Sequence, residues 1–153
     1  MNLYIVRHGD ALNGRDDSAR PLSEHGRQEI SALANALNGR VRVSEILHSG
    51  KTRAEQTATI LHQTAFANAS LSVRAGLTPN DDPSGLANDL LSWPNDLMLV
   101  SHLPFVSCLA SSLIDDTPWT IPFLFNTGTC LALQRRADTW MIQWMLDPSL
   151  LRS

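Results

Sequence analysis

Short apolar runs and helically spaced apolar positions alternate along the first third of the chain. The run from Leu3 to Val6 is rich in β-branched and aromatic residues and predicts a buried strand. Apolar positions at helical spacing follow Ser23, which can cap a helix that stops at Asn38-Gly39. A second short strand is predicted at Ile46–His48. The chain therefore begins with a strand, a helix and a second strand.

The same alternation continues to the end of the sequence. The further predicted elements are a helix capped by Ser49 or Thr52, a strand at Leu71–Arg74, a short helix over Leu86–Leu91, a strand at Leu97–Val100, a helix beginning near Pro104, and strands at Thr129–Leu133 and Trp140–Leu146. The last two strands are expected to form an edge hairpin, with Trp140, Ile142 and Trp144 on one core-facing side. Strands alternating with helices predict an α/β fold: a three-layer sandwich whose mostly parallel central sheet is flanked by helices.

Length and charge narrow the classes of function. At 153 residues the chain fits a single domain spanning 1–153, with enough residues to bury a sizeable core. The formal net charge is −3, from 12 Lys and Arg against 15 Asp and Glu. This balance provides no long-range attraction to nucleic acid or to an anionic membrane. Any anion site must therefore come from a local cluster of cations.

The cysteines and the apolar windows indicate a cytoplasmic protein. Cys108 and Cys130 are too few for a disulfide framework and fall in apolar patterns, as buried thiols in a reducing compartment do. No secretory signal is expected, because Arg7 follows the first apolar run instead of preceding it. The most apolar window, Leu97–Ile114, is interrupted by His102 and a proline and falls short of a membrane span.

Cations and histidines follow the predicted strands. Arg7 and His8 end the first strand, His102 follows Leu97–Val100, and Arg53 begins a helix. In open α/β sheets, ligands bind in the crevice beyond the carboxyl ends of the strands. If these two strands are neighbours, His8 and His102 face each other across that crevice. Each residue alone is explained as well by a solvated strand end, an exposed helix position or a hydrogen-bonded loop histidine. Together, these guanidinium and imidazole groups are suited to bind the oxygens of a phosphoryl group. Histidine can also form a covalent bond to a phosphoryl group.

Four separated motifs resemble the histidine phosphatase superfamily, in that family's order and across the whole chain. They are Leu3-Tyr4-Ile5-Val6-Arg7-His8-Gly9, Arg20-Pro21-Leu22-Ser23-Glu24-His25-Gly26, Arg53-Ala54-Glu55-Gln56-Thr57 and Ser101-His102. The short length, Leu77-Thr78-Pro79 and Ser101-His102-Leu103-Pro104 look most like the SixA-type protein phosphohistidine phosphatases. The resemblance implies a phosphoglycerate mutase-like fold without a large helical cap.

The resemblance also implies roles for particular residues. His8 would take the phosphoryl group and then be hydrolysed by water, while Arg7, Arg53 and His102 bind the phosphoryl oxygens. Arg20 matches the family's Arg-Pro-Leu element and is expected to face the site. The implied chemistry uses no metal and no other cofactor. The implied substrate is a histidine-containing phosphotransfer domain or a phosphotransferase-system carrier, and we expect a monomer.

One departure from the family bears on the substrate. Larger relatives carry a general-acid glutamate in an insertion before the second histidine, and here Asp81 and Asp82 are the only nearby carboxylates. Both are explained more simply as solvated turn residues. A leaving imidazole takes a proton by itself, with a reference pKa of about 6.5, whereas an alkoxide needs an acid. Phosphohistidine therefore fits better than a phosphate ester.

Several alternatives stay open at this stage. A small-molecule phosphomonoesterase of the same superfamily and a non-catalytic phosphohistidine-binding regulator are the rival functions. His48 ends a strand on the same side as the site, and its role is undecided. Asp16-Asp17 and Asp115-Asp116 have no histidine at ligand spacing, so we expect no metal site there.

Overall fold

The computed structural model describes residues 1–116 and 121–151. Within them one six-stranded sheet has the order β3-β2-β4-β1-β5-β6. Its strands are β1 (Asn2–Arg7), β2 (Glu45–His48), β3 (Ser70–Val73), β4 (Leu97–Ser101), β5 (Cys130–Arg136) and β6 (Thr139–Leu146). The first four strands of this order run parallel, whereas β5 and β6 are antiparallel to their neighbours. The predicted mostly parallel sheet is confirmed.

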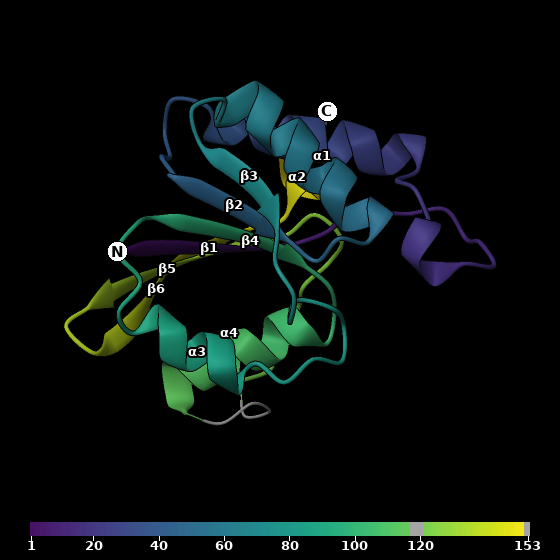
Figure 1. The fold of residues 1–153 in the computed structure, drawn as a ribbon. Coiled ribbons are helices and arrows are strands. Elements are labelled where there is room, and N and C mark those ends of the chain that lie inside the picture. The colour runs from purple at the N-terminus through teal and green to yellow at the C-terminus, as the bar shows by residue number, and fades with distance from the viewer. Residues whose placement is uncertain (117–120, 152–153) are drawn as a thin grey trace.

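Helices cover both faces of the sheet (Figure 1). The helices α1 (Glu24–Leu37) and α2 (Thr52–Ala65) pack on one face, and α3 (Ser84–Leu90) and α4 (Phe105–Asp115) pack on the other. Short 3-10 helices, η1 (Asp17–Ala19) and η2 (Pro148–Leu151), complete the described elements. The three-layer α/β prediction is thus confirmed.

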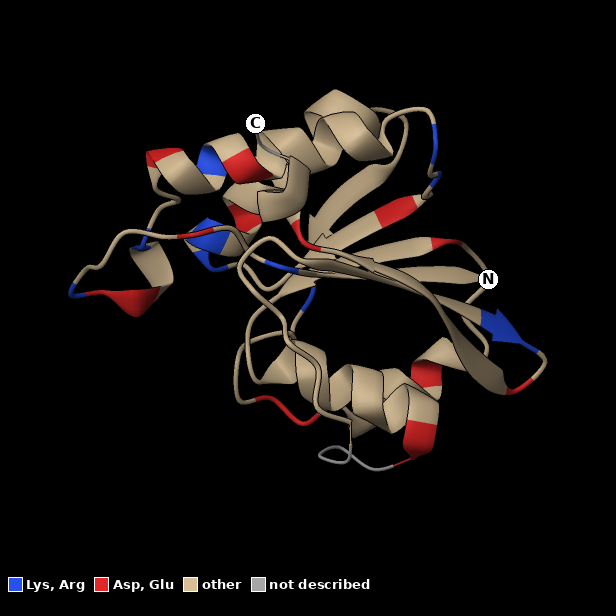
Figure 2. Ribbon diagram, turned by 180° about the vertical axis from the view of Figure 1, so that it is seen from behind, with Lys and Arg blue, Asp and Glu red and all other residues tan. Residues whose placement is uncertain are grey.

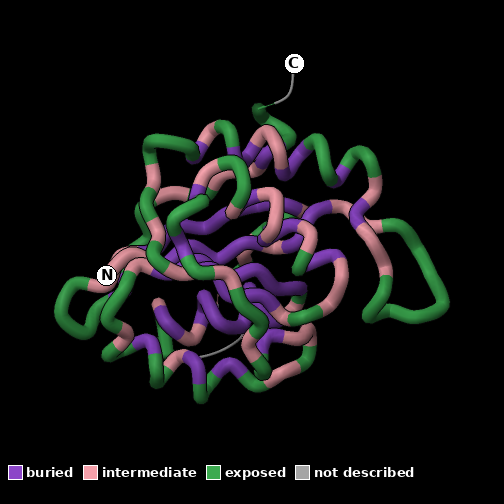
Figure 3. The backbone as a smooth tube through the Cα atoms, turned by 45° about the horizontal axis from the view of Figure 1, so that its top comes forward, coloured by how far each residue is buried: buried purple, intermediate pink, exposed green. Residues whose placement is uncertain are grey.

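Successive side chains of the central strands point to opposite faces of the sheet and contribute to two hydrophobic cores. Leu3 and Ile5 of β1 pack with α3 and α4, while Tyr4 and Val6 pack with α1 and α2. All five residues of β4 are buried, as expected for a central parallel strand covered on both faces. Figure 3 shows this buried layer of strands between helices whose outer sides are exposed. β1 pairs in parallel with β4, and the last pair is Arg7 with Ser101, so the two strands end together.

The start of α1 holds the loop that follows β1. The Ser23 hydroxyl accepts a hydrogen bond from the Gly26 N–H at 3.0 Å, which confirms the predicted cap. The same hydroxyl donates to the Asp10 carboxylate at 2.6 Å. The Ser23 N–H also donates to the Asp10 carbonyl at 2.9 Å. One serine therefore caps the helix and anchors the loop to it.

The cap of α2 and the bounds of β3 differ from the sequence predictions. The N-cap of α2 is Lys51, with no side-chain cap, so the prediction of Ser49 or Thr52 was wrong. The Ser49 hydroxyl instead lies 2.6 Å from a histidine of a neighbouring strand end. The strand β3 begins and ends one residue earlier than predicted. Pairing of β3 with β2 sets these bounds, and the residue pattern alone does not reveal that register.

The face assignment in β6 was also wrong. The pairing of β5 with β6 shifts register between Ala132 and Leu133, as at a β-bulge. Trp140 consequently lies in the core under α3 and α4, whereas Trp144 packs on the α1 and α2 side. Ile142, expected in the core, is 53% exposed. An extra residue in a strand moves the following side chains to the opposite face.

Two further sequence expectations can be compared with the structure. Cys108 and Cys130 are free and buried, and burial raises the pKa of both thiols. None of the helices in residues 1–116 and 121–151 combines the length and apolar character needed to traverse a bilayer.

Gly26 allows the close approach of α1 to the loop after β1. A Cβ atom at this position would lie 2.1 Å from the backbone oxygen of Asp10, a contact that neither element can relieve by a side-chain rotation. We expect Gly26→Ala to lower the free energy of unfolding by about 1–3 kcal/mol. Urea denaturation followed by circular dichroism measures this change.

Gly85 provides the matched control for that substitution. It also lies in a helix, α3, but a Cβ atom there would meet no heavy atom within 4 Å. Gly85→Ala should leave the free energy of unfolding unchanged or raise it by up to about 1 kcal/mol, because alanine favours a helix more than glycine does. Equal effects of the two substitutions would contradict the steric argument.

Candidate active site

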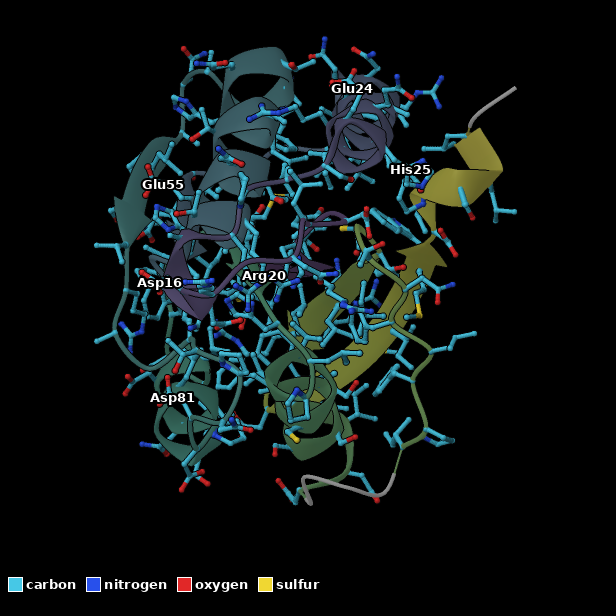
Figure 4. The ribbon with its side chains drawn as sticks, turned by 90° about the vertical axis from the view of Figure 1, so that its right-hand side faces the viewer. Asp16, Arg20, Glu24, His25, Glu55 and Asp81 are labelled. Carbon is cyan, nitrogen blue, oxygen red and sulfur yellow. The ribbon has the colours of Figure 1, made fainter. Side chains whose placement is uncertain are left out.

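The candidate active site lies where the central parallel strands end. Arg7, the last residue of β1, pairs with Ser101, the last residue of β4. His8 and His102 directly follow these strand ends, and their ring centroids are 5.0 Å apart. Figure 4 views the molecule from this edge, with Arg20 near the centre and Asp81 on the side of α3 and α4. The structure thus brings the two predicted histidines together.

His8 presents one ring nitrogen to the site, and its other ring nitrogen is hydrogen-bonded to the backbone. Its side chain is buried, and Nδ1 lies 2.7 Å from the carbonyl oxygen of Gly9. Since a carbonyl only accepts, Nδ1 carries the proton and Nε2 carries the lone pair. The Arg53 Nε–H donates to this Nε2 at 3.3 Å. The free electron pair of His8 therefore points at a guanidinium group.

The surroundings of His8 keep its ring neutral. Burial is the main cause, and the charges of Arg53, Arg7 and Arg20 add to it, whereas the Gly9 hydrogen bond acts in the opposite direction. Together they lower the pKa of His8 from 6.5 to about 4. At neutral pH the Nε2 lone pair is consequently available as a nucleophile.

His102 is the second neutral histidine. It is 1% exposed, and its Nε2 lies 2.6 Å from the Ser49 hydroxyl oxygen. Its Nδ1 is buried and has no hydrogen-bond partner among the described residues. Burial, followed by the nearby His8, Arg53 and Lys51, lowers the pKa of His102 to about 3. One ring nitrogen of His102 is therefore free to bind a ligand.

The two candidate arginines are held by backbone carbonyls. Arg7 Nη1 donates to the Phe125 carbonyl at 2.7 Å, and its Nε is buried without a partner among the described residues. Arg53 is 4% exposed, and its Nη1 donates to the Asp17 carbonyl at 2.7 Å. Both guanidinium groups are thus fixed, and a fixed guanidinium binds a phosphoryl group with less loss of entropy than a free side chain does.

Asp17 links three cations beside the histidines. Its carboxylate lies 2.7 Å from Lys51 Nζ, 3.2 Å from Arg20 Nη1 and 3.4 Å from Arg53 Nη2. Hydrogen bonding with Lys51, with help from Arg20 and Arg53, holds the pKa of Asp17 well below its usual range. The loop that carries this residue projects from the sheet edge with acidic and basic positions interspersed (Figure 2).

Asp17 and its neighbours show why the sequence pattern was incomplete here. Arg20 lies at the edge of the site, where its Nη1 donates to the Asp17 carboxylate. Its Nε also donates to the Leu12 carbonyl at 2.9 Å. Asp16 caps η1 by accepting from the Ser18 N–H. No role for Asp17 or Lys51 could be predicted from the sequence, because the contacts between them depend on how the loop folds back over α2.

Thr57 links the loop after β1 to the helix α2. Its role was likewise not predicted from the sequence. Its hydroxyl oxygen accepts from the Gly9 N–H at 3.0 Å and donates to the Arg53 carbonyl at 2.8 Å. It is fully buried. Gly9 itself must be a glycine, because a Cβ atom there would lie 2.8 Å from Ile30. The only sequence signal for Thr57 was its place in the Arg53–Thr57 motif.

His48 and the two loop aspartates have local structural contacts. His48 is buried, and its Nδ1 accepts from the Gly50 N–H at 3.1 Å. Asp81 accepts from both the N–H and the hydroxyl of Thr78, at 2.8 and 2.6 Å. Asp82 accepts from the Ser84 N–H at 2.9 Å. These hydrogen bonds lower the pKa of both aspartates.

Comparison with known proteins identifies the family. Residues 3–78 match the model of the histidine phosphatase superfamily, branch 1. Over 99% of its length the chain is 31% identical to phosphohistidine phosphatase SixA of Escherichia coli (strain K12), of which it covers 97%. This chain belongs to the histidine phosphatase superfamily. Histidine phosphatases are hydrolases, and the chain is accordingly a phosphatase.

Solved structures share this fold. The structure of SixA complexed with tungstate superposes with a TM-score of 0.88 and 30% sequence identity, covering 99% of this chain and 100% of that one. A phosphoserine phosphatase from Entamoeba histolytica, in complex with 3-phosphoglyceric acid, matches with a TM-score of 0.74. It is 16% identical, and 94% of this chain and 95% of that chain are covered, so this likeness shows the fold alone.

The lowered pKa of His8 can be measured in the free protein. We expect a titration of histidine ring nitrogens by NMR to give His8 a midpoint at about pH 4. Because its pKa is lowered, the ring stays neutral down to that pH and becomes charged only below it. A His8→Asn variant assigns the signals by loss of the His8 resonances. A midpoint near the ordinary value of about 6.5 would contradict the desolvated site described above.

Removal of the Thr57 hydroxyl should weaken both the fold and the site. Thr57→Val keeps the shape of the side chain but leaves the buried Gly9 N–H without a partner. We expect the free energy of unfolding to fall by about 1–3 kcal/mol. Phosphatase activity should fall as well, because the Gly9 carbonyl orients His8. Denaturation and activity are measured beside Thr57→Ser, which retains the hydroxyl and should stay close to the wild type.

Proposed function

We propose that this protein is a phosphohistidine phosphatase. It dephosphorylates a histidine-phosphorylated signalling or phosphotransfer protein through a phosphohistidine intermediate on His8. The observation that carries this proposal is the orientation of His8. Its Nδ1–H is engaged by the Gly9 carbonyl, so the neutral ring directs the Nε2 lone pair toward Arg53.

The proposed reaction has two steps of in-line displacement. In the first, His8 Nε2 forms a bond to phosphorus while the nitrogen–phosphorus bond of the substrate breaks. The substrate imidazole leaves with the electron pair of that bond and takes up a proton. In the second step, the oxygen of a water molecule forms a bond to phosphorus while the bond between His8 Nε2 and phosphorus breaks. His8 regains its lone pair, and the protons of the water leave with orthophosphate. Each step moves negative charge onto three oxygens, and cations placed around them stabilise it.

The proposed binding groups are Arg7, Arg53 and His102, with Arg20 at the edge. Two guanidinium groups and one imidazole N–H can each donate to a phosphoryl oxygen. The buried Arg7 Nε and His102 Nδ1 support this assignment, because both lack partners among the described residues. Buried polar groups normally have hydrogen-bond partners. Two buried nitrogen atoms without an acceptor beside one histidine are therefore consistent with a binding site for an oxyanion.

The carboxylates support phosphohistidine over a phosphate ester. Expulsion of an alkoxide needs a protonated acid, but hydrogen bonds lower the pKa of Asp81 and of Asp82. Asp17 is ionised as well, through its contacts with Lys51, Arg20 and Arg53. All three carboxylates are therefore hydrogen-bond acceptors at neutral pH. A leaving imidazole needs less assistance, because it is itself basic near neutral pH.

The open surroundings of the site suit a protein substrate. Between β3 and β4 the chain, which is described throughout this stretch, forms a loop and the short helix α3. No larger helical insertion lies there to enclose a small molecule. The similarity to a relative named phosphohistidine phosphatase SixA also supports this substrate class. We further propose that residues 1–153 act as one domain, as a monomer in the cytoplasm.

Replacement of His8 tests the proposed function. His8→Ala removes the nucleophile, and we expect loss of phosphate from a phosphohistidine protein to slow by at least about a thousandfold. The assay follows labelled phosphate on a phosphorylated phosphotransfer domain, with p-nitrophenyl phosphate as the ester comparison. The wild type should act on the phosphoprotein at low enzyme concentration and hardly on the ester. Quenching during turnover should trap label on the wild-type enzyme that is absent from the variant.

His25→Ala is the matched control, because His25 lies on α1 away from Arg20 in Figure 4. It should behave as the wild type does. Rapid ester hydrolysis with an unchanged phosphoprotein would indicate a phosphomonoesterase. Phosphate-dependent binding without release would indicate a regulator. Equal loss of label with His8→Ala would exclude His8 as the nucleophile.

A further inference from the structure

Ser49 contacts His102 from the turn between β2 and α2. Its hydroxyl oxygen lies 2.6 Å from His102 Nε2. The Lys51 N–H donates to the same oxygen at 3.3 Å. Neither the family motifs in the sequence nor the phosphoryl-binding groups named above include this serine. Its short contact with a buried, functionally placed histidine needs an explanation.

The direction of this hydrogen bond follows from the partners of the serine. A hydroxyl has one proton to donate and two lone pairs to accept with. The Lys51 N–H occupies one lone pair, so the remaining proton needs an acceptor. Among the described residues, His102 Nε2 is the acceptor within reach. The Ser49 hydroxyl therefore donates to Nε2, and the ring proton of His102 resides on Nδ1.

This choice of nitrogen matters because His102 is neutral. Burial and the neighbouring cations lower its pKa to about 3, so at neutral pH the ring carries a single proton. A doubly protonated ring would donate from both nitrogens whatever its neighbours were. In a neutral ring, the group that engages one nitrogen decides what the other can do. The buried Nδ1 of His102 lacks a partner among the described residues. The ring centroids of His102 and His8 are 5.0 Å apart.

We infer that Ser49 is a positioning residue that fixes the tautomer of His102, so that His102 Nδ1–H donates to an oxygen of the phosphoryl group on its way to or from His8. This inference deepens the proposed function and rests on it. Loss of the Ser49 hydroxyl lets the proton move to Nε2. A lone pair on Nδ1 then faces the phosphoryl oxygens, and attraction is replaced by repulsion.

The turn that carries Ser49 is itself held by His48. The Gly50 N–H donates to His48 Nδ1 at 3.1 Å, and Gly50 has a φ of +90°, in the left-handed region that favours glycine. Burial lowers the pKa of His48, so its ring is neutral and able to accept this bond. The residues on both sides of Ser49 therefore fix its backbone. This arrangement gives His48 a structural purpose that its position at a strand end did not reveal.

Substitution of Ser49 tests the inference by two independent readouts. Nitrogen NMR of the free protein should show His102 with its proton on Nδ1 in the wild type. In Ser49→Ala, protonation of Nε2 should appear. We expect kcat on the phosphohistidine protein to fall about tenfold to a hundredfold, with a smaller change in KM, because the lost donor acts mainly on the charge of the transition state.

Two further variants separate positioning from a purely structural effect. Ser49→Thr keeps a hydroxyl at the same place and should restore both the wild-type tautomer and most of kcat. Thr52→Ala removes a hydroxyl from the adjacent first residue of α2, which forms no hydrogen bond with either site histidine in the described structure. It should leave both readouts unchanged. Spectra of all variants also show whether each is folded.

The possible outcomes distinguish this inference from the proposed function. An unchanged His102 tautomer in Ser49→Ala would overturn the inference, as would a changed tautomer with wild-type kcat. Failure of the wild type on the phosphoprotein would instead contradict the proposed function. In that case the affinity for inorganic phosphate still tests Ser49. It should fall in Ser49→Ala and recover in Ser49→Thr, and equal affinity in all three proteins would overturn the inference.

Discussion

The hydrogen bond between His8 Nδ1 and the Gly9 carbonyl is the interaction on which the site depends. It assigns the proton to one nitrogen and leaves the other as a nucleophile. The bond forms only if Gly9 holds its conformation, and the Gly9 N–H is bound by Thr57 of α2. Gly9 also lies so close to α1 that a side chain would collide with Ile30. Two helices therefore determine the orientation of one imidazole ring.

Electrostatics and burial act in the same direction around this ring. Desolvation disfavours the charged form of an imidazole, and neighbouring arginines disfavour it further. His8 and His102 are both kept neutral in this way, although they lie in a cluster of positive charge. The arginines thus have two effects: they attract a phosphoryl dianion, and they keep the nucleophile unprotonated. The exposed carboxylate of Asp17 balances part of this charge at the outer edge.

The sequence could predict much of the fold, and the comparison explains where it could not. The buried run at β1 and the Ser23 cap of α1 both follow from local patterns, and the structure confirms them. That β1 and β4 are neighbours was only a condition of the sequence argument, and the structure shows that they pair. The face of Trp144 could not be predicted, because a register shift near Ala132 changes the alternation of β6. Patterns of period two give no sign of where an extra residue is accommodated.

The same limit applies within the candidate site. The strand-end histidines could be identified because both belong to strands that end at one sheet edge. The contacts of Thr57 and Ser49 were not predicted, because each hydroxyl binds an element that is distant in sequence. A serine just before a helix suggests a cap, and only the tertiary structure shows that the Ser49 hydroxyl contacts His102 instead. The catalytic roles of Arg7, His8, Arg53, His102 and Arg20 remain predictions until they are tested.

The strand order determines when the site can form during synthesis of the chain. The strand β1 precedes the others in the chain, yet its neighbours in the sheet are β4 and β5, which are made only after β2 and β3. The ends of β1 and β4 cannot meet until a long intervening segment has left the ribosome, and contacts so distant in sequence also slow folding. A partly synthesised chain can contain His8 and Arg53 but has no opposing His102. The phosphoryl-binding cluster therefore assembles only after β4 has been made and has paired with β1.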